Sequence, residues 1–160
     1  MAVGSETHLT WWVGWISEPI KDMTYTIPEM NMLDYARQRA IQALSIPHTV
    51  VLATSGPAGV QASDFPCEAK ELILYLLVPR TSDHLFNLEH NSSVTLLAAG
   101  WELKGEAQVS TASSSALDLD LLREPGAEWC VLVRIDPWRI QIKREGGWGN
   151  IETIDLNPRR

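Results

Sequence analysis

Basic residues are scarce and scattered in this 160-residue sequence. Its 13 Lys and Arg residues are outnumbered by 20 Asp and Glu residues, which gives a formal net charge of −7. No basic cluster occurs, because the C-terminal Arg159–Arg160 pair is too short to count as one. Since a nucleic-acid-binding surface needs clustered Lys and Arg to contact phosphates, we expect no nucleic-acid partner.

Cysteines and long apolar runs are also few. Cys67 and Cys130 are the two cysteines and form no C-x-x-C pair, so we expect no zinc site built from them and two reduced thiols on strands. The apolar run from Leu9 to Ile16 is broken by Gly14 and is too short to span a bilayer. No cationic region accompanies it, so we expect no signal peptide, no membrane partner and a cytoplasmic protein.

Signatures of catalytic and metal sites are missing as well. The sequence contains no nucleophile elbow, P-loop, Rossmann glycine pattern or metalloprotease motif. It also has no H-x-x-x-H or acidic spacing that would hold a metal. We therefore expect no metal site, and we nominate no catalytic acid or base.

The sequence does contain enough apolar residues for one globular domain, and an unusual concentration of tryptophan near its start. The hydrophobic content is 45%, a globular value. Residues 1–30 form a Trp-rich N-terminal arm in which Trp11, Trp12 and Trp15 fall within five positions. We interpret this arm as packing its rings on the domain or on a second subunit, and an aromatic wall over a ligand is the alternative.

Helical patterns are short and few. The spacing of apolar residues predicts a helix from Asn31 to Leu44, which Asn31 can cap and which Pro47 cannot continue. A second short helix is predicted from Ser82 to His90, with Ser82 as its N-cap. A third is favoured from Ser113 to Arg123, where the apolar spacing fits a helix or a strand.

The remaining patterns predict strands joined mostly by hairpins. The run from Glu71 to Val78 is almost wholly apolar, as expected of a strand buried on both faces. At least six such strands predict a mainly β fold, a small antiparallel barrel of six to seven strands with short flanking helices. The domain would span residues 31–145, and residues 146–160 would form a C-terminal tail. The predicted strands are 48–54, 60–65, 71–78, 93–98, 101–110, 129–135 and 138–143, with a turn at Ser55–Gly59, a connection at Pro66–Lys70, an interruption at Asp136–Pro137 and a loop at Gly146–Asn150.

The segment from Pro79 to Ala107 carries the most information about function. A strand ends at Pro79, and Arg80, Thr81 and Ser82 lead directly into the predicted helix. The N-terminus of a helix preceded by such residues can hold a phosphate, because its backbone N–H groups and its dipole favour an anion. This makes the segment the best candidate for a cofactor site.

The motifs in and around this segment resemble those of the pyridoxamine 5′-phosphate oxidase-like family of FMN-binding split barrels. The family pattern of Thr-Ser-x-Lys-x-x-Asn-Leu, then Asn-Pro-x-Val, then Gly-x-Ala is matched here in order and spacing. The likeness covers roughly residues 32 to 142. The matching stretches are Thr81–Leu88, Asn91–Val94 and Gly105–Ala107, with Val51–Thr54, the turn at Gly59 and Val133–Pro137 as flanking similarities.

The resemblance implies a homodimer with two FMN sites at the subunit interface, and a flavin-dependent oxidoreductase whose substrate is unknown. In such an enzyme the flavin carries the redox chemistry, and the protein binds and orients it. Related proteins also use the deazaflavin F420 or bind haem. The implied cofactor-binding residues are Arg80, Thr81, Ser82 and His84 for the phosphate, and Ala62, Ser63, Asp64 and Phe65 along the flavin ring.

A second hypothesis is a non-enzymatic split-barrel dimer that binds another small ligand in the same cleft. His84 stands where the family has Lys, and a histidine is only partly charged near neutral pH. Asp64 adds a negative charge where a phosphate or flavin would come close. Haem is a third possibility, with His84 or His90 as the axial ligand.

Each candidate residue also has a purely structural interpretation. Ser82 can act as a helix cap alone, Arg80 as a solvated charge and His84 as a surface histidine. Asn87 and Leu88 would then position the helix. Tyr75, Trp101, Trp138 and Trp148 are interpreted as packing residues.

Overall fold

The computed structural model describes residues 31–110, 117–146 and 149–156. The predicted N-terminal arm, Trp148 and the last four residues lie outside these ranges. Two α-helices, two short 3₁₀ helices and seven strands make up the described part. They are α2 (Met32–Ser45), β1 (Thr49–Gly56), β2 (Gly59–Lys70), β3 (Ile73–Pro79), α3 (Asp83–His90), β4 (Ser93–Ala98), β5 (Trp101–Ser110), η2 (Asp120–Arg123), η3 (Ala127–Trp129), β6 (Cys130–Lys143) and β7 (Ile151–Asp155).

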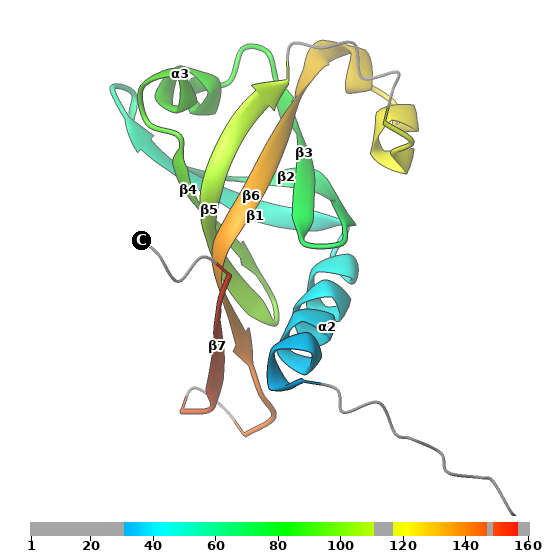
Figure 1. Ribbon diagram of the computed structural model, residues 1–160. Helices are drawn as coiled ribbons and strands as arrows, with labels where there is room; N and C mark the ends of the chain where they lie inside the picture. The colour runs from blue at the N-terminus through cyan, green and yellow to red at the C-terminus, as the bar shows by residue number, and fades with distance from the viewer. Residues whose placement is uncertain (1–30, 111–116, 147–148, 157–160) are drawn as a thin grey trace, which may run out of the picture. The chain divides into compact units, whose positions relative to one another are not determined.

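The strands form a closed antiparallel barrel. Their order in the sheet is β3-β2-β1-β4-β5-β6-β7, and an additional pairing of β3 with β6 closes the first six into a barrel. β7 pairs with β6 alone and extends the sheet outside the barrel (Figure 1). Closure satisfies the hydrogen bonds of the strand edges, so most of the sheet offers no open edge to another chain. The prediction of a mainly β barrel of six to seven strands is confirmed.

The barrel interior is filled by alternating residues of the strands. In β1 the side chains of Val50, Leu52 and Thr54 are buried, and the residues between them are more exposed. β3 departs from this alternation because both of its faces are covered, as its apolar run predicted. Leu74, Leu76 and Val78 belong to the barrel core, whereas Tyr75 and Leu77 pack outside it.

A segment between β5 and β6 covers the outer face of β3. Leu119 and Leu121 are buried there against Tyr75, Leu77 and Leu132. The backbone N–H of Leu121 donates to Glu68 Oε2 over 2.9 Å, which ties this segment to β2. The structure therefore has a second, smaller apolar cluster outside the barrel, and it explains why β3 is apolar on both sides.

The helix α2 lies against one end of the barrel through its C-terminal half. Ala40 and Leu44 are fully buried, and Trp101 Nε1 donates to Ala43 O over 2.9 Å. Leu33, near the start of this helix, is 74% exposed. The apolar side chains of α2 pack on the barrel from Ala36 onward.

Two prolines predicted to end strands lie within them instead. Pro66 is part of β2 and sits where that strand changes partners, from β1 at Thr49↔Pro66 to β3 at Cys67↔Leu76. Its missing N–H therefore interrupts neither ladder at its centre. The predicted connection at 66–70 was wrong for this reason.

The second proline lies opposite a β-bulge. Pro137 pairs with Gly105, and the register of β5 on β6 shifts between Lys104 and Gly105. A Cβ on Gly105 would lie 2.7 Å from Asp136 O, so only glycine allows this close approach. β6 therefore runs without a break through Asp136–Pro137, and the predicted interruption was wrong.

The chain after β5 also differs from the prediction. Of the predicted helix at 113–123, residues 113–116 lie outside the described ranges, and only Asp120–Arg123 is helical, as a 3₁₀ turn. A strand at Ile151–Asp155 was not predicted, because only a loop was expected after Gly146. Among the described residues, no helix is long and apolar enough to cross a membrane.

Candidate ligand site at the start of α3

The barrel is split between β2 and β3. β2 pairs with β3 only from Lys70↔Ile73 to Cys67↔Leu76, while β3 continues along β6 to Pro79↔Cys130. The other half of β2 follows β1 to the turn at Gly59. The two strands therefore diverge beyond Cys67, and the chain that leaves β3 enters α3 at this end of the barrel (Figure 1).

The first turn of α3 is capped and open to solvent on one side. Ser82 adopts an extended backbone, and its Oγ accepts a hydrogen bond from His84 N over 3.2 Å. Arg80 and Thr81 are exposed directly before this cap. The predicted N-cap is confirmed, and three side chains that can contact an anion stand together at a helix start.

His84 points into the barrel rather than to solvent. Its side chain is 3% exposed, and its Nδ1 lies 3.0 Å from Thr54 Oγ1 on β1. Its ring meets Phe65 of β2 edge-on, with 5.1 Å between the ring centroids. The interpretation of His84 as a surface histidine is wrong, because the ring is buried against Thr54 of β1 and Phe65 of β2.

The environment of His84 favours the neutral imidazole. Burial lowers the pKa of His84, and nearby Asp83 opposes this only in part. Its Nε2 is buried and has no hydrogen-bond partner among the described residues. A neutral, inward-facing ring supplies no positive charge to a phosphate at the start of α3. Arg80 is therefore the positively charged side chain that could contact a phosphate there.

Asn87 fixes α3 to the turn between β1 and β2. It is fully buried, its Oδ1 accepts from Ala58 N over 2.9 Å, and its Nδ2 donates to Gly59 O over 2.8 Å. A Cβ on Gly56 would lie 2.8 Å from Asn87 Oδ1, so glycine is needed for α3 to come this close. The prediction that Asn87 positions the helix is confirmed.

The predicted ring-binding residues on β2 are only partly gathered at this site. Phe65 is 6% exposed and contacts His84, so these two are brought together. Ala62, Ser63 and Asp64 are exposed on β2, with Asp64 opposite Val51 in the register of β1. The structure describes no contact between these three residues and Arg80, Thr81 or Ser82.

Two contributors to this region were not predicted. Thr54 ends the buried side of β1 and lies within hydrogen-bond distance of both His84 and Asn87. Trp129 O accepts a hydrogen bond from Arg80 N over 3.1 Å, although the two residues are far apart in the sequence. Nothing in the sequence pattern signalled Trp129, because its place depends on the pairing of β3 with β6. The alternation of β1 signalled that Thr54 would be buried.

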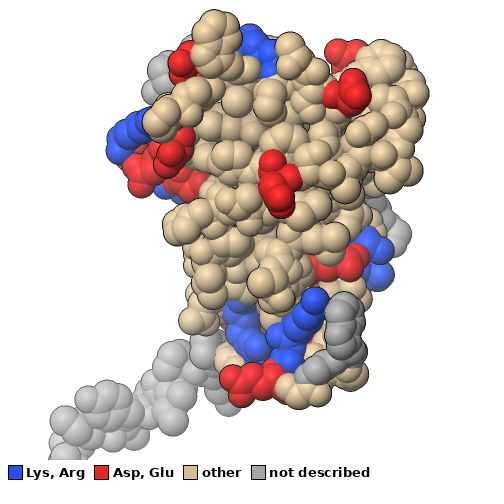
Figure 2. Space-filling model, turned by 180° about the vertical axis from the view of Figure 1, so that it is seen from behind, with Lys and Arg blue, Asp and Glu red and all other residues tan. Residues whose placement is uncertain are grey.

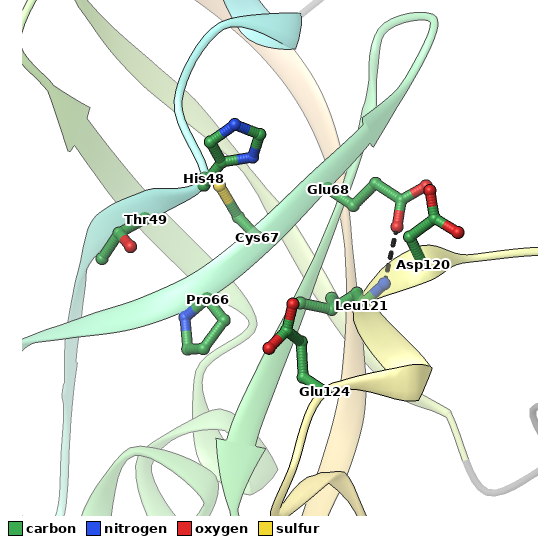
Figure 3. Close-up of a pocket in the computed structure, with 8 residues that line it drawn as sticks. All are labelled: His48, Thr49, Pro66, Cys67, Glu68, Asp120, Leu121 and Glu124. Carbon is green, nitrogen blue, oxygen red and sulfur yellow. Dashed lines mark hydrogen bonds between the residues drawn. The ribbon is translucent and has the colours of Figure 1, made fainter.

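A separate cleft of about 440 Å³ lies between the start of β1, the middle of β2 and η2 (Figure 3). Figure 3 shows Pro66 across the opening from Leu121 and Glu124. Three carboxylates line it, and none of its described lining residues is Lys or Arg. Burial works to raise the pKa of Glu68, but the hydrogen bonds from Leu121 N and Lys70 outweigh it and lower that pKa. An anionic group would be repelled here. The lining residues are His48, Thr49, Pro66, Cys67, Glu68, Asp120, Leu121 and Glu124.

The thiol that lines this cleft is buried and contacts a backbone carbonyl. Burial raises the pKa of Cys67 to about 11, and its Sγ lies 3.3 Å from Pro47 O. Both cysteines are free and lie on strands, as predicted. Within the described residues, no group of three His, Cys, Asp or Glu side chains could hold a metal ion.

Solved structures with the same fold are known, although the sequence alone finds no relative. A comparison with protein-family models gives no match, and neither does a comparison with curated proteins. General Stress Protein 26 from Bacillus anthracis str. Sterne is similar with a TM-score of 0.58 and 20% sequence identity, over 74% of this chain and 98% of that one. A Clostridium acetobutylicum protein related to general stress protein 26 of Bacillus subtilis (pyridoxinephosphate oxidase family) gives a TM-score of 0.57 and 14% identity, over 78% of this chain and 94% of that one.

The name of a third similar structure mentions a ligand. The heme binding protein from Mycobacterium smegmatis gives a TM-score of 0.55 and 18% identity, over 74% of this chain and 56% of that one. The chain thus has the split-barrel fold of pyridoxamine 5′-phosphate oxidase-like proteins. The resemblance predicted from the motifs is confirmed at the level of the fold.

Proposed function

We propose that this protein binds FMN at the split between β2 and β3, with the phosphate at the start of α3, and acts as a flavin-dependent oxidoreductase of the pyridoxamine 5′-phosphate oxidase-related type. The observation that carries the proposal is the run of Arg80, Thr81 and Ser82 at the capped start of α3. A guanidinium, two hydroxyls and helix N–H groups are the donors that phosphate oxygens prefer. The flavin would supply the redox chemistry, and these residues would bind and orient it.

The charges around the split make this a weak anion site rather than a strong one. Arg80 is opposed by Asp83 in the first turn of α3, and neutral His84 adds no compensating charge. Like charges near a phosphate reduce its affinity. We therefore expect FMN to bind less tightly than it would if residue 84 were Lys.

The proposal includes a homodimer, formed through the outer faces of β1 and β4. Val51 of β1 pairs with Leu97 of β4, and Leu97 is 41% exposed on that face. Val60, near the start of β2, is 82% exposed. In Figure 1, β1 and β2 run behind β5 and β6. The view from behind in Figure 2 shows mostly uncharged residues, with charged side chains at the margins and an acidic patch near the middle. A largely uncharged sheet face of this kind fits a second copy of the chain.

A second candidate function is a non-enzymatic dimer that binds another small ligand, with haem as one such ligand. His90 Nδ1 lies 3.0 Å from Phe86 O, an arrangement that fixes the ring and leaves Nε2 to coordinate a metal. A structural neighbour named as a heme binding protein favours the same idea. A Soret band that appears with haemin and is lost in His90→Ala would support it.

The visible spectrum of the purified protein, before and after addition of FMN, tests the first proposal. We expect flavin absorbance near one FMN per chain, and a mass of two chains by light scattering. Arg80→Ala should weaken FMN binding, and Leu97→Lys should yield a single-chain mass. Colourless protein that takes up no added FMN would exclude the flavin function and leave the second candidate.

A further inference from the structure

Trp129 is unusually exposed for a tryptophan. It leaves 73% of its surface accessible, more than any other aromatic side chain in the described part of the molecule. Tryptophan is on average well buried in folded proteins, because its large apolar ring gains much from leaving water. An exposed indole at a defined place in the fold is therefore a candidate for ligand contact.

Trp129 lies directly beside the proposed phosphate site. Val78↔Val131 and Pro79↔Cys130 are the last pairs of the β3–β6 ladder, and the hydrogen bond from Arg80 N to Trp129 O extends it by one step. Arg80 and Trp129 thus stand opposite each other across the end of these strands. Directly opposite residues of an antiparallel pair typically have Cβ atoms about 4.5–5.5 Å apart.

The backbone that presents Trp129 is held on both sides. Trp129 N donates to Gly126 O over 3.0 Å, and Trp129 O accepts from Arg80 N. Gly126 adopts a positive φ of 90°, which lets the chain turn into η3, the short helix that ends at Trp129. Because the main chain that carries the ring is already fixed, less conformational entropy would be lost when a ligand binds.

We propose that Trp129 is the ring-binding residue of this site, so that the site takes a phosphorylated heteroaromatic compound whose phosphate lies at Arg80–Ser82 and whose ring stacks on the indole. This inference rests on the proposed function and adds to it the residue that recognises the ring. An electron-poor heterocycle stacks well on the electron-rich indole, and stacking adds affinity without an added charge. It thus compensates for the weak positive charge at the start of α3.

Fluorescence titration of FMN into the wild-type protein, Trp129→Ala, Trp129→Phe and Trp138→Phe tests the inference. Trp138 is a half-buried residue of β6 beneath Arg139 and serves as the control. We expect Trp129→Ala to weaken FMN binding by roughly 5- to 150-fold, the range that aromatic stacking gives in nucleic-acid sites. Trp129→Phe should lose less, and Trp138→Phe should bind as the wild type does.

The outcomes separate this inference from the function on which it rests. If the wild type binds FMN and Trp129→Ala binds it equally well, the role of Trp129 is overturned and the flavin function stands. If the wild type binds no FMN, the proposed function fails and this inference fails with it.

Discussion

Thr54 Oγ1 and His84 Nδ1 lie 3.0 Å apart inside the barrel and join β1 to the first turn of α3. Asn87 Nδ2 donates to the same hydroxyl over 3.2 Å. When the hydroxyl accepts from Asn87 and donates to Nδ1, both contacts are satisfied by a neutral imidazole. This buried network fixes where α3 begins, and it therefore fixes where Arg80, Thr81 and Ser82 are presented.

Removing the Thr54 hydroxyl should destabilise the protein. Thr54→Val keeps the shape of the side chain but leaves His84 Nδ1 and Asn87 Nδ2 without this partner, at a cost of about 1–3 kcal/mol for a buried unsatisfied polar group. Urea unfolding followed by tryptophan fluorescence measures the change. Thr49→Val, at an exposed position of the same strand, serves as the control and should change the free energy of unfolding by about 0.5 kcal/mol or less. Equal stability of the two variants would contradict the network.

The close approach of α3 to the β1–β2 turn predicts an asymmetry between two glycines. A Cβ on Gly56 would lie 2.8 Å from Asn87 Oδ1 and 3.0 Å from Asn87 Cα, whereas a Cβ on Gly100 meets nothing within 4 Å. Gly56→Ala should therefore cost about 1–3 kcal/mol through overpacking, and Gly100→Ala should have little effect. Thermal unfolding of both variants provides the comparison, and a loss of stability confined to Gly100→Ala would count against this geometry.

The buried imidazole predicts a loss of stability in mildly acidic solution. Burial lowers the pKa of His84 from 6.5 in the folded state. As the pH falls through about 6.5, the unfolded chain binds a proton that the folded chain does not, so the free energy of unfolding decreases until the pH reaches the lower, folded pKa. Urea unfolding at pH 7.5 and pH 5.5 should show this decrease.

A variant that does not titrate supplies the control for the pH effect. His84→Gln retains a side chain that can hydrogen-bond Thr54 but carries no imidazole. Contributions from the other histidines are the same in both proteins, so the decrease between the two pH values should be smaller in His84→Gln. An identical decrease in the two proteins would show that His84 is not the group responsible.

The two thiols should differ in reactivity in the folded protein. Burial raises the pKa of Cys67 to about 11, and its side chain is 5% exposed, whereas Cys130 is half-buried at the start of β6. Because the thiolate is the reactive form, brief treatment with a thiol reagent at pH 8 should modify Cys130 first. Mass spectrometry of the peptides measures this, and labelling in urea should modify both. Faster labelling of Cys67 in the folded state would contradict its burial.

Much of the fold could be predicted because local patterns and tertiary structure agree. The apolar run of β3, the Ser82 cap and the hairpin from β4 to β5 are all set by neighbours in sequence. The errors arose where a distant partner decides the outcome. Pro66 lies within a strand because β2 changes partners there, and Pro137 lies within one because Gly105 opens a bulge opposite it.

The candidate site was harder to predict for the same reason. The run Arg80–Ser82, which we propose as the phosphate site, is continuous in sequence and could be singled out from it. The orientation of His84 depends on Thr54 and Phe65, which come from two other strands, and the position of Trp129 depends on the β3–β6 pairing. The motif showed that His84 stands where the family has Lys, but it could not show that the imidazole ring turns inward.

The comparison of FMN with riboflavin tests the central claim most directly. Both contain the same ring, and only FMN carries the phosphate that we place at the start of α3. In equilibrium titrations at pH 7.5, we predict that the wild type binds FMN at least about tenfold more tightly than riboflavin, a difference of about 1.4 kcal/mol, and that Arg80→Ala loses most of this preference. Equal affinity of the wild type for the two compounds, or no binding of either, would contradict the account.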